Sequence, residues 1–144
     1  MTEPPKIEDF PHQDYDKLRY GDLDTLGHVN NVVFATLFST GRTGLFGLPD
    51  IDAWNRADVT FVIARLELDY HAELRWPGTV ESGTGIKSIG KSSVALFQAL
   101  YQAQNCVATA HTVMVQVSAK THRPVPISDT MRALLAPYMF MFRS

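Results

Sequence analysis

The sequence predicts an α+β domain in which a curved antiparallel sheet of about five strands wraps around one central helix. One long segment, residues 31–49, carries apolar residues at helical spacing on nearly every side. The segments after it have the length or the alternation of strands and follow one another at hairpin distances. Connections this short leave no room for the crossover helices of a parallel sheet. The 144 residues, of which 45% are hydrophobic, are enough for one domain with its own core.

We expect a single domain over residues 1–144, with a short N-terminal arm at about residues 1–14. The arm has acids and prolines where a signal peptide needs a basic start and an apolar run of about 7 to 15 residues. Cys106 is the only cysteine, which excludes an internal disulfide and is typical of a reducing compartment. No segment approaches the roughly 18 apolar residues of a membrane span, and a net charge of −2 provides no basic field for nucleic acid. The sequence therefore predicts a cytoplasmic protein that binds neither membranes nor nucleic acid.

After a short strand, the central helix is expected within residues 31–49, ended by Gly47 and Pro49. Gly41 and Gly44 each lower the helix propensity by roughly 1 kcal/mol relative to alanine, so packing must stabilise this helix. Two interpretations stay open: the glycines allow a close approach of the helix backbone to a neighbouring element, or the helix breaks near Gly41. The apolar positions of the helix are Val33, Phe34, Leu37, Phe38, Leu45 and Phe46.

The first long strand is expected at residues 65–71, where apolar and polar residues alternate strictly. Leu66, Leu68 and Tyr70 share its buried face, and Arg65 on the other face is expected to be solvated or paired. The remaining elements are strands within residues 79–90, 92–103 and 106–119, a turn at Gln104-Asn105, and a final helix capped by Ser128 or Asp129 that reaches about Tyr138.

A helix that is apolar nearly all round must be enclosed, and a curved sheet wrapped around it, the hotdog fold, is the simplest enclosure. Residues 19–42 read RYGDLDTLGHVNNVVFATLFSTGR. They resemble the start of the 4-hydroxybenzoyl-CoA thioesterase-like branch of the hotdog superfamily, in which an Asp, a small turn and often His-Val-Asn-Asn precede the central helix. The resemblance spans about residues 15–138 and implies an acyl-CoA thioesterase, which releases a free acid and the CoA thiol. Supporting matches lie at Ala64 with Tyr70, at Pro77-Gly78, at 88–93 and at 123–127.

The residues before the helix suit this chemistry. A helix start, here near Asn30 and Asn31, offers unpaired N–H groups and a partial positive charge, which can stabilise an oxyanion. Asp24 lies far enough upstream for the chain to fold back across this site, where its carboxylate can activate water or attack the carbonyl directly. The alternative is that Asp24 only shapes a turn or a cap.

By resemblance, Asp24 matches the catalytic aspartate of the family. Asn31 matches the helix-start residue whose backbone amide polarises the thioester carbonyl. His28, Val29 and Asn30 are expected beside the substrate, although the ring of His28 also supports the loop and Asn30 is first of all an N-cap.

The central helix departs from the family pattern at one place. Related members often carry acids there, as in Phe-Glu-Glu-Ala-Arg, whereas residues 38–42 of this sequence read Phe-Ser-Thr-Gly-Arg. Asp24 therefore has to act without a helix acid. Ser39 or Thr40 could orient water, or could simply belong to the helix surface or core. Asp22, the first acid of the Asp-x-Asp pattern, is expected to be structural.

The resemblance implies an acyl-CoA or acyl-ACP (acyl carrier protein) thioester as substrate, whose phosphates need positive charge and backbone donors. Lys91, Ser92 and Ser93 follow Gly90 at a strand turn where the family often binds the pantetheine or nucleotide end. An ordinary hairpin turn is the equal alternative. Other cationic candidates are Lys87, Lys120, His122 and Arg123, and the aromatic residues that form either an acyl tunnel or only core are Phe34, Phe38, Phe46, Trp54 and Phe61.

The five histidines show no zinc-binding spacing, so no metal and no cofactor are expected. The edge and flank of a five-stranded sheet need protection, which predicts a homodimer or homotetramer. The resemblance implies that the ligand lies at a subunit interface. Two other functions stay open. One is a non-catalytic acyl-thioester binding module that uses the same groove, and the other is a dehydratase, for which the usual Asp and His pairing is not found.

Overall fold

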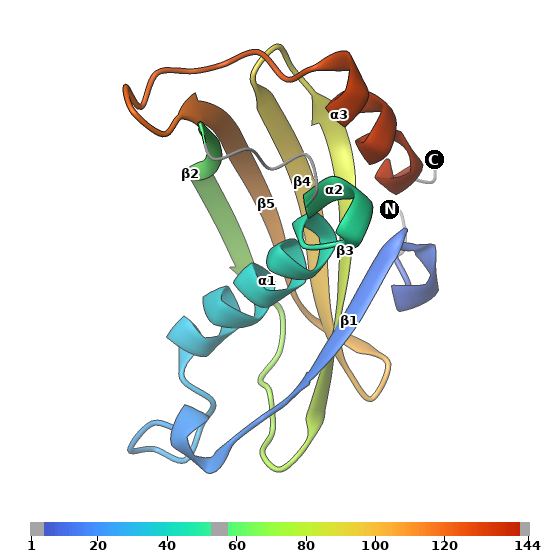
Figure 1. Ribbon diagram of the computed structural model, residues 1–144. Helices are drawn as coiled ribbons and strands as arrows, with labels where there is room; N and C mark the ends of the chain where they lie inside the picture. Colours follow the sequence, from blue (N-terminus) through green and yellow to red (C-terminus); the bar gives the residue numbers. More distant parts are fainter. Residues whose placement is uncertain (1–4, 53–57, 142–144) are drawn as a thin grey trace.

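The computed structural model describes residues 5–52 and 58–141 (Figure 1). A five-stranded sheet forms the main layer, and one long helix lies across one of its faces. In chain order the elements are the 3-10 helix η1 (Ile7–Asp9), β1 (His12–Lys17), the 3-10 helix η2 (Tyr20–Asp22), α1 (Asn31–Phe46), α2 (Pro49–Asp52), β2 (Val59–Tyr70), β3 (Thr79–Ile89), β4 (Ser93–Gln102), β5 (Asn105–Ser118), α3 (Asp129–Leu135) and the 3-10 helix η3 (Ala136–Tyr138).

The strands pair antiparallel throughout, in the order β1-β3-β4-β5-β2. The predicted hotdog architecture, with five antiparallel strands and one central helix, is therefore confirmed. The β4–β5 hairpin turns at Ala103 and Gln104, one residue before the expected turn, and both have a positive φ, as a two-residue hairpin loop requires. Ser128 caps α3 as expected, since its hydroxyl accepts a hydrogen bond from the Met131 amide at 3.1 Å.

Helix α1 is continuous through both internal glycines, so the predicted break near Gly41 is wrong and the predicted close approach is confirmed. A β-carbon on Gly41 would lie 3.0 Å from Gln98 Nε2 on β4 and 3.1 Å from Thr84 Oγ1 on β3. One on Gly44 would lie only 2.6 Å from Asp14 Oδ2 on β1. The two glycines thus let the helix backbone lie directly on polar side chains of the sheet.

The position of α1 leaves one side of the sheet open. The helix packs mainly against β1, β3 and β4, and β2 forms the edge beyond β5 (Figure 1). On the inner face of β2, Leu66 is 40% exposed and Tyr70 is 50% exposed, although the alternation predicts a buried face there. The strand also begins at Val59 rather than at residue 65, because a bulge between Ile63 and Arg65 interrupts the alternation.

The outer face of the sheet is covered in part by the chain ends. Phe10 stacks on Phe97 of β4 and packs against Phe140, with ring centroids 5.7 and 4.7 Å apart. Part of the segment expected as an N-terminal arm therefore forms η1, the start of β1 and a small apolar cluster. Ile7 and Phe10 explain this order, because both side chains are buried.

Candidate active site

The loop before α1 folds back on itself. The Asp24 amide donates to the His28 carbonyl at 2.8 Å, and the Gly27 amide donates to the Asp24 carbonyl at 3.1 Å. Leu23 and Val29 form an antiparallel bridge on either side of this loop. Gly27 has a φ of +80°, a conformation that glycine adopts at little cost. As a result, the chain reverses direction between Leu23 and Val29, directly before α1.

Only one oxygen of the Asp24 carboxylate accepts hydrogen bonds from the residues that the structure describes. Its Oδ1 accepts hydrogen bonds from the Leu26 amide at 2.9 Å and from the His28 amide at 3.1 Å. These bonds give Asp24 the turn-forming role that the sequence offers as the alternative. Within residues 5–52 and 58–141, Oδ2 has no hydrogen-bond partner, and the side chain is partly exposed. One carboxylate oxygen therefore stays available for other chemistry.

The first turn of α1 leaves one amide unpaired. The Asn30 side chain accepts from the Val32 amide at 3.0 Å, so Asn30 is the N-cap that the sequence predicts. The Val33 amide donates to the Asn30 carbonyl at 2.9 Å. The Asn31 amide finds no acceptor in the part of the chain that the structure describes. It is a free donor at the positive end of a 16-residue helix.

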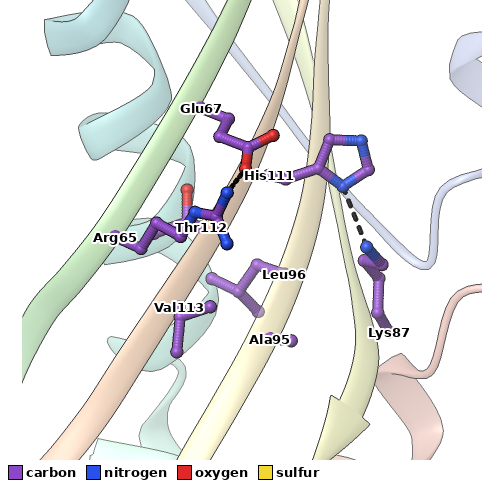
Figure 2. A pocket seen from close by; sticks show the side chains of 8 residues that line it. All are labelled: Arg65, Glu67, Lys87, Ala95, Leu96, His111, Thr112 and Val113. Carbon is purple, nitrogen blue, oxygen red and sulfur yellow. Dashed lines mark hydrogen bonds and ion pairs between the residues drawn. The ribbon is translucent and has the colours of Figure 1, made fainter.

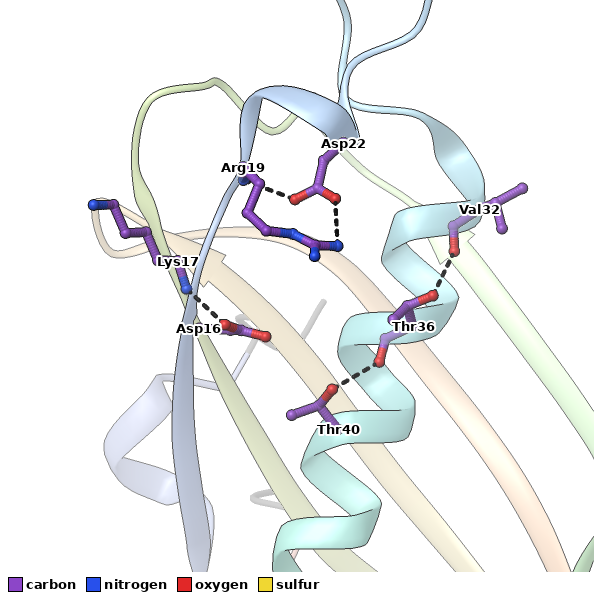
Figure 3. A network of polar contacts seen from close by, with 7 residues as sticks. All are labelled: Asp16, Lys17, Arg19, Asp22, Val32, Thr36 and Thr40. Carbon is purple, nitrogen blue, oxygen red and sulfur yellow. Dashed lines mark hydrogen bonds and ion pairs between the residues drawn. The ribbon is translucent and has the colours of Figure 1, made fainter.

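Asp22 has a structural role, as expected. It is 7% exposed, and its carboxylate accepts from the Arg19 amide at 2.8 Å and forms an ion pair with the Arg19 guanidinium at 3.2 Å (Figure 3). Its carbonyl also accepts from the Asn30 amide at 2.8 Å. Asp22 therefore ties the entry of the loop to the start of α1.

The Thr40 hydroxyl is hydrogen-bonded to the backbone of its own helix. Its hydroxyl donates to the Thr36 carbonyl at 3.1 Å, and Thr36 donates to the Val32 carbonyl in the same way (Figure 3). Both residues are exposed on the helix surface. The surface interpretation of Thr40 thus has direct support.

Sequence reasoning placed Tyr70 on the inner face of a strand and among the family matches but did not connect it to the helix start, which it contacts. Its hydroxyl donates to the Asn31 carbonyl at 3.0 Å, and its ring packs edge-on against Phe34 with centroids 5.0 Å apart. The available signal was a tyrosine at the end of a strictly alternating strand, on the face that points inward. Tyr70 attaches the end of β2 to the first turn of α1.

The other two predicted loop residues differ in accessibility. His28 is exposed, and its Nε2 lies 3.9 Å from Glu73 Oε1. Val29 is 7% exposed and belongs to the core cluster that contains Leu18 and Phe34. The side chain of Val29 therefore holds the loop on the core, so it does not lie open to a substrate in the single chain.

Lys91, Ser92 and Ser93 lie at the other end of the sheet. They form the β3–β4 turn, closed by the Gly90 amide donating to the Ser93 carbonyl at 2.8 Å. The Asp24 loop neighbours the opposite end of β3, where the Leu18 amide donates to the Gly78 carbonyl at 2.9 Å. An 11-residue strand is about 35 Å long. A single chain therefore does not bring this turn to Asp24.

The further cationic candidates are also remote from the Asp24 loop. Lys120, His122 and Arg123 follow the end of β5, where the His122 amide donates to the Ser118 carbonyl. Lys87 lies on the outer face of the sheet, with its Nζ 3.0 Å from His111 Nδ1 (Figure 2).

An open cavity of about 320 Å³ surrounds this outer-face pair (Figure 2). Arg65 is paired there with Glu67, as the sequence predicts. Burial, and then the charge of Lys87, lower the pKa of His111 below its usual value. Strand alternation places Arg65 and Glu67 on the face opposite to Leu66 and Tyr70, so this cavity lies on the other side of the sheet from α1.

A second cavity, of about 300 Å³, lies between α1 and the inner face of β2 and β5. Of the predicted tunnel aromatics, Phe46 lines it and packs on Phe61 with ring centroids 5.3 Å apart. Phe34 and Phe38 are buried in the core, and Trp54 lies outside the described residues. The lining residues are Ser39, Arg42, Thr43, Phe46, Gly47, Asp52, Ile63 and Met114.

Two further observations concern other kinds of site. Across residues 5–52 and 58–141, no three His, Cys, Asp or Glu side chains are grouped closely enough to hold a metal ion. In the same ranges, no helix is both long and apolar enough to cross a membrane. Cys106 is partly buried in β5, and burial raises the pKa of its thiol, which makes it a poor nucleophile.

The sequence and the fold were compared with known protein families and solved structures. The sequence matches the profile of the thioesterase-like superfamily over residues 18–135. Among curated proteins none matches it significantly. Among solved structures, it is similar to a protein of Pseudomonas aeruginosa strain PAO1, with 28% identity, a TM-score of 0.83, and coverage of 96% of this chain and 99% of that one.

Two other similar structures carry the name thioesterase. A predicted thioesterase from Bacillus stearothermophilus shares 28% identity with a TM-score of 0.83, over 92% of this chain and 98% of that one. A thioesterase from Thermus thermophilus, complexed with coenzyme A and zinc, shares 29% identity with a TM-score of 0.78, over 91% of this chain and 96% of that one.

Proposed function

Because the chain belongs to the thioesterase-like superfamily, we propose that this thioester hydrolase cleaves an acyl-CoA to the free acid and the CoA thiol, with Asp24 as its catalytic carboxylate. The observation that carries the proposal is the pairing of a half-engaged carboxylate with an unpaired helix-start amide. Among the described residues, Asp24 Oδ2 and the Asn31 N–H have no hydrogen-bond partner, and the Leu23–Val29 bridge folds the loop between these two residues back on itself.

The Asn31 amide supplies the electrophilic half of the reaction. The carbonyl oxygen of the thioester accepts its hydrogen bond, and the negative charge that develops on this oxygen is stabilised by the amide and by the positive end of the helix. The Tyr70 hydroxyl holds the Asn31 carbonyl from the other side. The bond restrains residue Asn31 through the neighbouring Asn31–Val32 peptide group, so the Asn31 amide needs little reorganisation as charge develops.

Asp24 supplies the other half by one of two routes. As a general base, Oδ2 takes a proton from water while the water oxygen bonds to the carbonyl carbon. The C–S bond then breaks, and the thiolate leaves and is protonated. As a nucleophile, Oδ2 bonds to the carbonyl carbon and expels the thiolate, and water then hydrolyses the mixed anhydride. A single turnover in ¹⁸O-water tests the nucleophilic route, because label in the Asp24 side chain requires the anhydride and its hydrolysis at the aspartyl carbon.

Coenzyme A is the proposed thiol carrier. The Thermus thermophilus thioesterase of similar fold was crystallised with coenzyme A, and an acyl-ACP is the alternative carrier. The basic turn at 91–93 and the Asp24 loop lie at opposite ends of one chain, so both contact one substrate only if a second copy contributes the turn. A cytoplasmic location fits this substrate class and the lone Cys106.

A homodimer or homotetramer is therefore part of the proposal. Strand β2 is a 12-residue edge strand of the described sheet, and its side chains Val62 and Ile63 are 41% and 46% exposed. A long edge with exposed apolar side chains invites pairing with a second copy. Light scattering at micromolar concentration tests this, and a strictly monomeric protein would remove the shared-site part of the proposal.

The Asp24→Asn variant tests the catalytic role directly. Asparagine keeps an Oδ1 acceptor for the Leu26 and His28 amides, so the loop should keep its conformation. Thiol release from a panel of acyl-CoAs and one acyl-carrier-protein thioester should fall about 10²- to 10⁴-fold, with an unchanged melting temperature. Wild-type rates in this variant would refute the assignment. Tight acyl-CoA binding without hydrolysis by the wild type would instead favour the binding module.

A further inference from the structure

Arg42 is a buried cation without a carboxylate partner. Its side chain lies on α1 at 8% exposure and lines the cavity between α1 and β2. Its Nη1 donates to Gln98 Oε1 at 3.2 Å. In the ranges 5–52 and 58–141, no carboxylate lies within ion-pair distance of it, and burial lowers the pKa of its guanidinium. A buried charge is normally paired, so this arrangement needs an explanation.

Gln98 holds the guanidinium in a defined place. The Gln98 side chain is fully buried, and its Nε2 donates to the Phe38 carbonyl at 3.0 Å and to Thr84 Oγ1 at 2.9 Å. These two bonds fix the amide, so that its oxygen points at Arg42. A guanidinium carries five N–H donors, and Gln98 uses one nitrogen. The donors that remain face a cavity of about 300 Å³.

The inner face of β2 runs between the proposed reaction centre and this cavity. With 3.6 residues per turn, Arg42 lies on almost the same side of α1 as Asn31, eleven residues earlier. Across from this side, β2 is attached to the helix by Tyr70 at one end and by Phe61 at the other. Between these two contacts, Leu66 is 40% exposed. Strand β2 therefore offers exposed apolar surface between the Asn31 amide and Arg42.

The distance between the Asn31 amide and Arg42 matches the length of a medium acyl chain. Eleven residues of helix span about 16 Å, and the arginine side chain extends back toward the N-terminus, which shortens the path by a few ångströms. An extended covalent chain advances about 1.2 Å per bond. About 9 to 13 bonds therefore connect a carbonyl at the Asn31 amide with a group at Arg42.

We propose that Arg42 binds a carboxylate at the far end of the acyl chain, so that the preferred substrates are CoA monothioesters of medium-chain dicarboxylic acids. This inference rests on the proposed function, since it assumes that the thioester lies at Asn31 and Asp24. The planar guanidinium matches a carboxylate in two-point hydrogen bonding. A plain acyl chain of the same length leaves the buried charge unpaired, so the site discriminates against it.

The test compares two substrates of equal length, decanoyl-CoA and the monothioester of decanedioic acid with CoA. The wild type should show a kcat/KM for the dicarboxylic substrate higher by roughly tenfold or more. Arg42→Met should lose this preference through a higher KM for the dicarboxylic substrate alone. Arg42→Lys, which keeps the charge, should retain part of it. Arg65→Met, on the exposed outer face of β2, is the matched control and should change nothing.

Three outcomes would overturn the inference: a wild type without preference for the dicarboxylic substrate, equal losses on both substrates in Arg42→Met, or the same change in Arg65→Met. Melting temperatures of both variants separate loss of folding from loss of recognition, and Arg42→Lys provides a second comparison if Arg42→Met does not fold. Non-hydrolysable thioether analogues of the two substrates repeat the comparison as binding constants. Absence of all hydrolysis would therefore refute the proposed function while the role of Arg42 is still decided.

Discussion

Replacement of Gly41 by alanine should destabilise the protein, although alanine is the better helix former. Intrinsic propensity favours alanine by roughly 1 kcal/mol within a helix. Against this gain, the new methyl group would lie 3.0 Å from Gln98 Nε2, 3.1 Å from Thr84 Oγ1 and 3.2 Å from Ser82 Oγ. All three side chains are buried, and two of them are bonded to each other, so they cannot move aside freely.

Overpacking of this kind costs about 1 to 3 kcal/mol, and the strained hydrogen bonds of Gln98 move the cost toward the upper end. We expect a net loss of about 1 to 2 kcal/mol in the free energy of unfolding. Urea denaturation should show this loss as a lower midpoint at an unchanged slope. Thr36→Ala, at an exposed position of the same helix, is the control and should be neutral or stabilising by about 0.5 kcal/mol. A Gly41→Ala variant as stable as the wild type would refute the close-packing argument.

Two more predictions concern Tyr70 and His12. Tyr70→Phe removes the hydrogen bond to the Asn31 carbonyl and should lower kcat by roughly two- to tenfold at nearly constant KM. The control is Tyr15→Phe, at a side chain that is 74% exposed, which should leave kcat unchanged. Equal kcat values in the two variants would count against the positioning role of Tyr70. Burial lowers the pKa of His12 below its ordinary value of 6.5, against the opposing charge of Asp14. The unfolded chain therefore takes up this proton first, and the stability of the folded protein should fall as the pH drops below about 6.5. His12→Gln should weaken this dependence in melting curves from pH 8 to pH 5, and parallel curves for the two proteins would contradict it.

The fold could be predicted because each element carries its own local signal. The apolar spacing at residues 31–49 and the glycine after Phe46 define the helix, and short connections require antiparallel strands. The start of β2 could not be found in this way. A bulge between Ile63 and Arg65 shifts the register, so the period of two that identifies residues 65–71 does not continue upstream. The exposure of the inner face of β2 depends on where α1 lies across the sheet, which alternation does not encode.

The candidate site was predictable in its residue types but not in its connections. Asp24, Asn30 and Asn31 stand out in sequence because turn formers, a cap residue and an apolar helix follow one another. Tyr70 contacts Asn31 from a strand residue 39 positions later in the chain. A pattern of neighbouring residues cannot predict a contact between positions so far apart. The distance between Asp24 and the turn at 91–93 is likewise a property of the whole sheet, since it follows from the length of β3.

The position of α1 links the stability of the fold to its chemistry. Gly41 and Gly44 allow the helix to lie directly on β1, β3 and β4, and this displacement leaves the inner face of β2 uncovered. A helix centred over β5 would instead bury Leu66 and Ile63, which are 40% and 46% exposed. It would also fill the cavity onto which Arg42 opens. A bulkier residue at Gly41 therefore acts on two properties at once. It weakens the packing against Gln98, and it moves the guanidinium that Gln98 holds in place. The Gly41→Ala variant should for this reason lose part of any preference for a dicarboxylic substrate as well as part of its stability, whereas a packing role alone would leave the ratio of the two kcat/KM values unchanged.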